Sequence, residues 1–115
     1  MTLTRRAFGA QTAKFTPLLL GEDFYHSADN TPLVINNWEN IATAGTVKWK
    51  QQVYSGNGYA EFNPYQSTEV SNVGWLISPE INMDAHEGEI LRFMSSQSYV
   101  SSAANKLEVF VSTDY

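Results

Sequence analysis

The sequence contains no cysteine, which excludes disulfide bonds, thiolate zinc sites and cysteine nucleophiles. It also lacks a long apolar run, since no stretch approaches the roughly 20 residues that a membrane-spanning helix needs. Basic residues are scarce, with 7 Lys and Arg against 12 Asp and Glu and a formal charge of −5. This acidic balance argues against nucleic acid or an anionic membrane as the main partner.

The length and the apolar content predict one globular domain. The 115 residues suffice for a single domain and hardly more. Hydrophobic residues make up 43% of the chain, which is enough to furnish a core. Arg5 and Arg6 give the chain a basic start, but only the short stretch 7–10 follows before Gln11. Because a signal peptide needs a longer apolar region, we predict none in this sequence.

No stretch of a dozen residues keeps a helical period, because proline, glycine and asparagine recur at short intervals. Between them lie short runs rich in valine, isoleucine and aromatic residues, a pattern typical of strands separated by turns. We predict strands at residues 33–41, 47–54, 59–62, 73–78, 89–95 and 106–112, and a weaker strand at 15–20. The composition of residues 63–72 predicts a polar loop, and that of residues 84–88 predicts a turn.

Alternation of apolar and polar residues supports half-buried antiparallel strands. In residues 106–112, for example, Leu107, Val109 and Val111 share one face. Residues 55–58, Ser-Gly-Asn-Gly, predict a tight turn because asparagine and glycine tolerate positive φ. The predicted core consists of residues on the apolar faces of these strands, namely Trp75, Ile77, Leu91, Phe93, Leu107, Val109 and Val111. Core packing is also the predicted use of the other two tryptophans, Trp38 and Trp49.

Two segments carry a resemblance to a known family. Residues 75–83 (WLISPEINM) and 107–115 (LEVFVSTDY) are similar to the choice-of-anchor J or cleaved-adhesin type of domain. Such domains occur on exported bacterial proteins, often lipoproteins of Bacteroidetes. The similarity extends to an acidic-aromatic opening at 22–24, to Trp38 and Trp49, and to the hairpin at 55–60.

The resemblance implies an all-β fold, an antiparallel jelly-roll β-sandwich of the galactose-binding-like type. Residues 21–115 would form this domain and residues 1–20 an N-terminal extension. A jelly roll needs about eight strands, and the chain stops at Tyr115, where such domains add further strands. The resemblance therefore implies an incomplete sandwich whose last strand, 106–112, lacks a partner. We expect self-association, by edge pairing or strand exchange, unless the N-terminal segment covers the open edge.

The resemblance also implies a calcium site near the first strand. Glu22, Asp23 and Asp29 lie in one loop-rich segment and offer the oxygen ligands that calcium prefers. Tyr25 stands where the family usually has glutamate, which removes one implied ligand. The alternative is that these groups are surface carboxylates without a metal.

Catalytic patterns are absent from the sequence. His26 lies three residues before Asp29, but no serine sits in a Gly-x-Ser-x-Gly elbow. Residues 84–89 gather His, Asp and Glu without the His-Glu-x-x-His spacing, so a polar turn is the favoured reading. Glu61 and Glu69 flank the polar loop and leave a glycosidase open as an alternative.

The resemblance, together with the all-β pattern and the lack of a catalytic constellation, implies a non-catalytic binding or adhesion module. By the same resemblance, it would belong to an exported bacterial protein at the cell surface or in the periplasm. Carbohydrate is the leading ligand class, because aromatic side chains can stack on sugar rings. The predicted ligand contacts are loop and hairpin residues, namely Tyr54, Asn57, Tyr59, Asn63 and Tyr65. Two alternatives stay open, a spacer domain without a ligand of its own and a fragment of a glycoside-processing enzyme.

Overall fold

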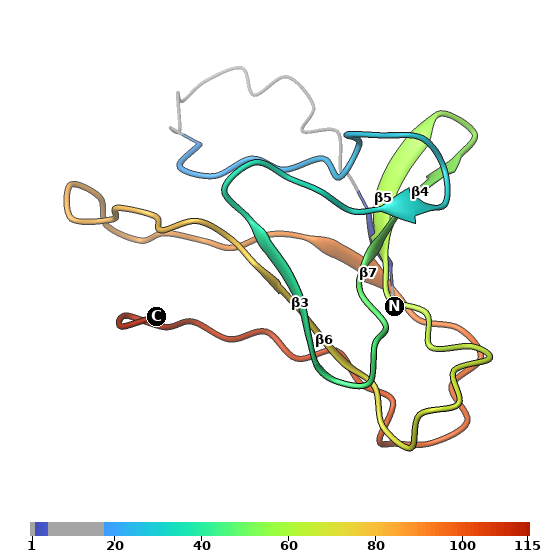
Figure 1. The fold of residues 1–115 in the computed structure, drawn as a ribbon. Coiled ribbons are helices and arrows are strands. Elements are labelled where there is room, and N and C mark those ends of the chain that lie inside the picture. Colours follow the sequence, from blue (N-terminus) through green and yellow to red (C-terminus); the bar gives the residue numbers. More distant parts are fainter. Residues whose placement is uncertain (1, 5–17) are drawn as a thin grey trace.

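The computed structural model describes residues 2–4 and 18–115, and within them the chain forms strands and loops but no helix (Figure 1). The strands are β1 (Thr2–Thr4), β2 (Thr31–Pro32), β3 (Glu39–Ala44), β4 (Lys50–Tyr54), β5 (Asn57–Glu61), β6 (Val73–Ile77) and β7 (Met94–Ser96). The predicted all-β class is therefore confirmed over this part of the chain. Among the same residues, no helix has the length and hydropathy needed to cross a lipid bilayer.

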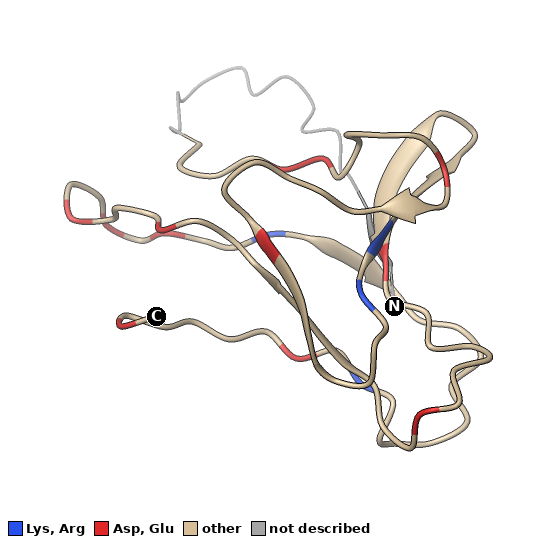
Figure 2. Cartoon of the chain, in the orientation of Figure 1, with Lys and Arg blue, Asp and Glu red and all other residues tan. Residues whose placement is uncertain are grey.

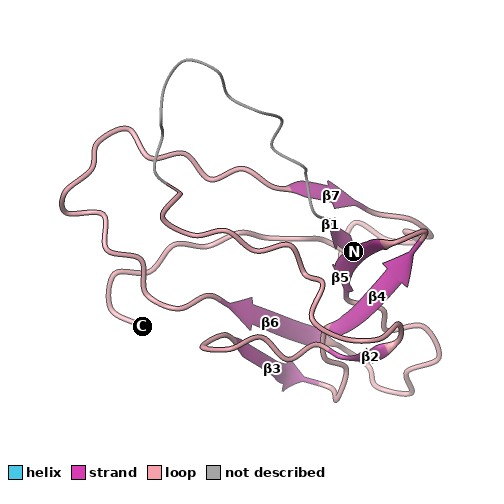
Figure 3. Ribbon diagram, turned by 90° about the horizontal axis from the view of Figure 1, so that it is seen from above, coloured by secondary structure: helices cyan, strands magenta, loops and turns pink. Residues whose placement is uncertain are grey.

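The strands form two antiparallel sheets (Figure 3). One has five strands in the order β2-β4-β5-β1-β7, and the other pairs β3 with β6. β1 belongs to the predicted N-terminal extension, yet it lies between β5 and β7 in the larger sheet. A hairpin joins β4 to β5, and positive φ at Ser55 (51°) and Gly56 (77°) matches the twist of the strands. The predicted turn is thus present, centred on these two residues rather than on Asn57.

The core is built mostly from residues outside the strands, and of its five buried apolar residues only Ala60 belongs to a strand, β5. The buried apolar residues are Phe24, Leu33, Ile35, Trp49 and Ala60, with Trp38, Phe62, Leu76 and Leu107 packed against them. Trp49 Nε1 donates a hydrogen bond to the Gly74 carbonyl of β6 at 3.2 Å, and its ring centroid lies 5.5 Å from that of Phe62. A Cβ on Gly74 would clash with the Phe62 ring, so glycine permits this close approach.

Three of the predicted strands, 47–54, 59–62 and 73–78, match β4, β5 and β6 closely. The predicted strand 33–41 is instead divided by a turn, in which Asn37 has a φ of 63° and Trp38 N–H donates to the Ile35 carbonyl at 3.1 Å. The strand at 89–95 is reduced to β7, and residues 106–112 form no strand. Of the weak strand at 15–20, residues 18–20 are loop and the others lie outside the described residues.

The predicted core was largely wrong. Leu91, Phe93, Val109 and Val111 expose 65%, 46%, 53% and 86% of their surface, and Trp75 exposes 37%. Ile77 and Leu107 are half-buried. Alternation correctly indicates that one face of a strand is apolar, but burial also requires a second layer over that face. Apart from β7, the segments after β6 run as loops outside the two sheets (Figure 1), so these side chains lack such a layer among the described residues.

Candidate functional site

Three of the five predicted ligand residues share the outward face of the β4–β5 hairpin. Tyr54 pairs with Asn57, and Tyr59 pairs with Gln52, in the antiparallel register. Their neighbours Gln51 and Ala60 point the opposite way and are fully buried. Because successive residues of a strand point to opposite faces, Tyr54, Asn57 and Tyr59 lie together on the face directed away from the core.

Two carboxylates give this outward face a negative character. Glu61 Oε1 accepts hydrogen bonds from Gln52 Nε2 at 3.3 Å and from Asn63 Nδ2 at 3.5 Å. Asp29 Oδ1 accepts one from the Val53 N–H at 2.8 Å. Burial, followed by the charges of Glu61 and Asp29, raises the pKa of Tyr59 above its ordinary value of 10.0. The Tyr59 hydroxyl therefore keeps its proton at neutral pH and can donate a hydrogen bond.

The other two predicted ligand residues, Asn63 and Tyr65, line a groove of about 560 Å³ beside this face. Its size falls in the range of about 300–1,000 Å³ typical of small-molecule sites. Pro32 lies at one end, the segment leading into β4 forms one side, and the polar loop after β5 forms the other. The lining residues are Pro32, Thr46, Val47, Lys48, Trp49, Lys50, Asn63, Tyr65, Gln66, Ser67, Thr68 and Glu69.

Local hydrogen bonds shape the polar loop and present Tyr65 outward. Asn63 Oδ1 accepts a bond from the Tyr65 N–H at 3.0 Å, and the Ser67 N–H donates to the Pro64 carbonyl at 2.9 Å. Ser67 Oγ donates to Asn72 Oδ1 at 3.1 Å, which ties the middle of the loop to its end. With its backbone held in this way, Tyr65 leaves 81% of its surface exposed at the groove.

Sequence reasoning missed two further residues of this groove, Lys48 and Lys50. Both are exposed, while Trp49 between them is buried with 5% of its surface accessible. Lys48 also lines a smaller hollow of about 280 Å³ between residues 32–35 and β6. The signal was present, because alternation around a buried tryptophan places both lysines on one outward face.

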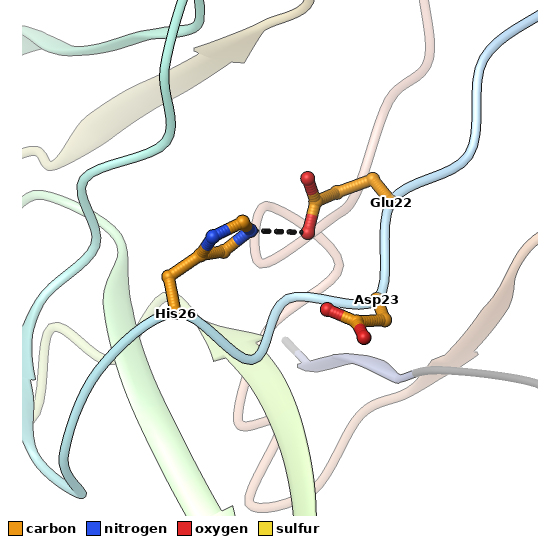
Figure 4. Close-up of side chains that lie close together, drawn as sticks. All are labelled: Glu22, Asp23 and His26. Carbon is orange, nitrogen blue, oxygen red and sulfur yellow. Dashed lines mark hydrogen bonds and ion pairs between the residues drawn. The ribbon is translucent and has the colours of Figure 1, made fainter.

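The predicted metal ligands do not all lie together. Glu22 and Asp23 lie close to each other and to His26 (Figure 4). One potential ligand atom from each of these three residues lies within 4.8 Å of the other two. His26 Nε2 is 2.6 Å from Glu22 Oε1. Asp29 is not part of this group, and its carboxylate bonds the β4 backbone instead.

The donor atoms of this group are two carboxylates and one imidazole. Calcium takes six to eight oxygen ligands, whereas an imidazole nitrogen suits zinc and other transition metals. Glu22 Oε1 also accepts the Phe24 N–H at 2.5 Å, and Asp23 Oδ1 accepts the Tyr25 N–H at 3.0 Å. Both carboxylates therefore shape the loop, and the predicted calcium site stays a prediction.

Comparisons with models of protein families, with curated proteins and with solved structures find no match. The choice-of-anchor J resemblance accordingly stays a prediction based on residues 75–83 and 107–115.

The predicted turn at 84–88 is present, with the His86 N–H donating to the Met83 carbonyl at 2.9 Å. Of the two carboxylates on which the glycosidase alternative depends, Glu69 lines the groove and Glu61 bonds Gln52 and Asn63.

Proposed function

We propose that this chain is a non-catalytic carbohydrate-binding module of an exported bacterial surface protein, built on a jelly-roll β-sandwich. The observation that carries the proposal is the groove in which exposed Tyr65 stands beside Asn63 and the hydroxyl and amide side chains of residues 66–68. The outward face of the β4–β5 hairpin, with Tyr54 and Tyr59, continues from this groove through the Asn63–Glu61 hydrogen bond.

The chemistry of the groove suits a sugar. A tyrosine ring offers an apolar face to the C–H groups of a pyranose ring. Amide and hydroxyl side chains, here Asn63, Gln66 and Ser67, can each donate and accept hydrogen bonds with sugar hydroxyls.

A screen of the protein on a glycan array, followed by titration calorimetry with the best oligosaccharide, tests this proposal. Tyr65→Asn should weaken binding by about tenfold, because base–aromatic stacking, a comparable contact, contributes about 1–3 kcal/mol per ring. Tyr99→Asn is the matched control, since Tyr99 is fully exposed in another loop and its φ of 55° suits asparagine. Absence of glycan binding would contradict the proposal and favour the spacer alternative.

We also propose that the module associates with a second copy through residues 106–112. Leu107, Val109 and Val111 alternate with polar and aromatic residues, as in a strand, yet the backbone here makes no hydrogen bond to other described residues. Antiparallel pairing of two such segments about Val109 would place Leu107 opposite Val111 on one face. That arrangement would pair the N–H and C=O groups along one edge of each copy and cover apolar side chains that each copy leaves exposed.

A further inference from the structure

Acidic residues are spread over the described chain, whereas basic residues occupy only a few places in it (Figure 2). The described residues hold all 12 Asp and Glu of the chain but only four cations, Lys48, Lys50, Arg92 and Lys106. Two of these four, Lys48 and Lys50, line the groove, together with a single carboxylate, Glu69. Glu61 lies opposite Lys50 in the β4–β5 register and bonds Asn63, so it stands close to the groove as well. The side of the groove that leads into β4 thus holds two of the four described cations on a surface rich in carboxylates.

Both groove lysines have ammonium groups that are free to bind an anion. Neither forms an ion pair with a carboxylate among residues 2–4 and 18–115, whereas Lys106 pairs with Glu108 at 2.8 Å. Lys50 Nζ contacts only a neutral group, Asn30 Oδ1, at 3.3 Å. Lys48 and Lys50 alternate with the buried side chains of Trp49 and Gln51, so both lysines are directed away from the core.

We propose that the groove selects an acidic saccharide, one that carries a uronate carboxylate or a sulfate ester. This inference rests on the carbohydrate function proposed above and names its ligand class. The acidic group lies against Lys48 and Lys50, while Tyr65 stacks on a sugar ring and the loop amides bind hydroxyls. Glu69, on the loop side, accepts hydrogen bonds from hydroxyls.

Distant carboxylates do not cancel this preference at physiological salt. The Debye length is then about 8 Å, so exposed charges farther away are largely screened. The two lysines act at contact distance, where screening is weak, and each exposed charge pair contributes about a two- to fivefold gain in affinity. Together they give an acidic ligand an advantage of about tenfold over its neutral counterpart.

Titration calorimetry with two matched pairs of oligosaccharides tests the inference. One pair is tetragalacturonate and its fully methyl-esterified form, and the other is a chondroitin sulfate oligosaccharide and its desulfated form. The proteins compared are the unaltered chain, the double variant Lys48→Gln/Lys50→Gln and the control Arg92→Gln/Lys106→Gln. The control removes the same two charges outside the groove.

We expect the acidic member of one pair to bind about tenfold more tightly than its neutral partner. The lysine double variant should lose this preference and keep its affinity for the neutral sugar, and the control should retain both. The pair that shows the preference identifies carboxylate or sulfate as the recognised group. Equal binding within both pairs would overturn the inference and leave the carbohydrate function intact. If no sugar binds, or if inorganic sulfate binds as tightly as the oligosaccharides, both the inference and the carbohydrate function fail.

Discussion

The buried side chain of Gln51 holds two backbone groups of the loop that carries His26. Its Oε1 accepts the His26 N–H at 2.9 Å, and its Nε2 donates to the Phe24 carbonyl at 2.5 Å. Gln51 has no exposed surface, and Phe24 has the left-handed φ of 51°. This glutamine therefore anchors the loop on β4 and helps to fix an uncommon backbone conformation.

Gln51→Leu should lower the free energy of unfolding by about 2–4 kcal/mol. The change leaves a buried carbonyl and a partly buried N–H without partners, and each costs about 1–3 kcal/mol. Urea unfolding followed by tryptophan fluorescence measures the loss. Gln52→Leu is the control, because the Gln52 side chain lies on the outward face and donates a hydrogen bond to Glu61 alone. Equal losses for both variants would show that Gln51 does not anchor the loop.

Trp49→Ala should cost about 3–5 kcal/mol of stability, as expected for a large buried aromatic residue. The variant also loses the hydrogen bond from Trp49 Nε1 to the Gly74 carbonyl of β6. Trp75→Ala should cost less than about 2 kcal/mol, because Trp75 is 37% exposed and its indole contacts Thr43 and Phe110 near the surface. Chemical denaturation of the two variants makes the comparison, and a larger loss at Trp75 would contradict this core.

Deprotonation of Tyr59 should lower the free energy of unfolding in alkaline solution. Burial and nearby negative charge raise the pKa of Tyr59 in the folded state, so the unfolded chain loses this proton first. The stabilising contribution is complete below pH 10 or so and is lost as the pH rises through the folded-state pKa. Tyr59→Phe should therefore lose less stability between about pH 8 and about pH 11 than the unaltered chain. Tyr65→Phe, at an exposed position, is the control, and identical pH profiles for all three proteins would contradict the prediction.

Metal binding at the Glu22 loop should appear as a rise in melting temperature, since a ligand of the native state stabilises it by mass action. If calcium is the ligand, as the sequence predicts, His26→Ala should keep the shift, because calcium does not need the imidazole. If zinc is the ligand of Glu22, Asp23 and His26, the same variant should abolish it. Thermal denaturation in millimolar calcium or micromolar zinc distinguishes the metals, and no shift with either rules out the site.

Self-association should be visible as a mass above that of a monomer in light scattering at high protein concentration. Val109→Lys should shift the protein toward the monomer, because two copies would bring like charges together at the centre of the pairing. Val70→Lys is the control at a fully exposed position in the polar loop. A monodisperse monomer for the unaltered chain would refute pairing through residues 106–112.

The β4–β5 hairpin and β6 could be predicted because their determinants are local, a Ser-Gly turn and short alternating runs. The core could not be predicted in this way. Apolar and polar residues alternate around Leu91 and Val109 as they do around Ala60, and only tertiary contacts decide which apolar face is covered. The same reason explains why the full lining of the groove could not be predicted. Asn63 and Tyr65 were recognisable as residues of the loop 63–72. Lys48 and Lys50 belong to the groove only because this loop lies beside the start of β4 in the folded chain, which the sequence does not show.

The two sides of the groove differ in how freely they can change over evolutionary time. Lys48 and Lys50 flank a core tryptophan, so their placement is inherited with the fold, whereas Tyr65 stands on a loop held mainly by its own hydrogen bonds. Surface loops accept substitutions and insertions with little effect on stability. Substitutions in residues 63–69 could therefore change the chemistry of one side of the groove over evolutionary time, while Lys48 and Lys50 keep their place on the other.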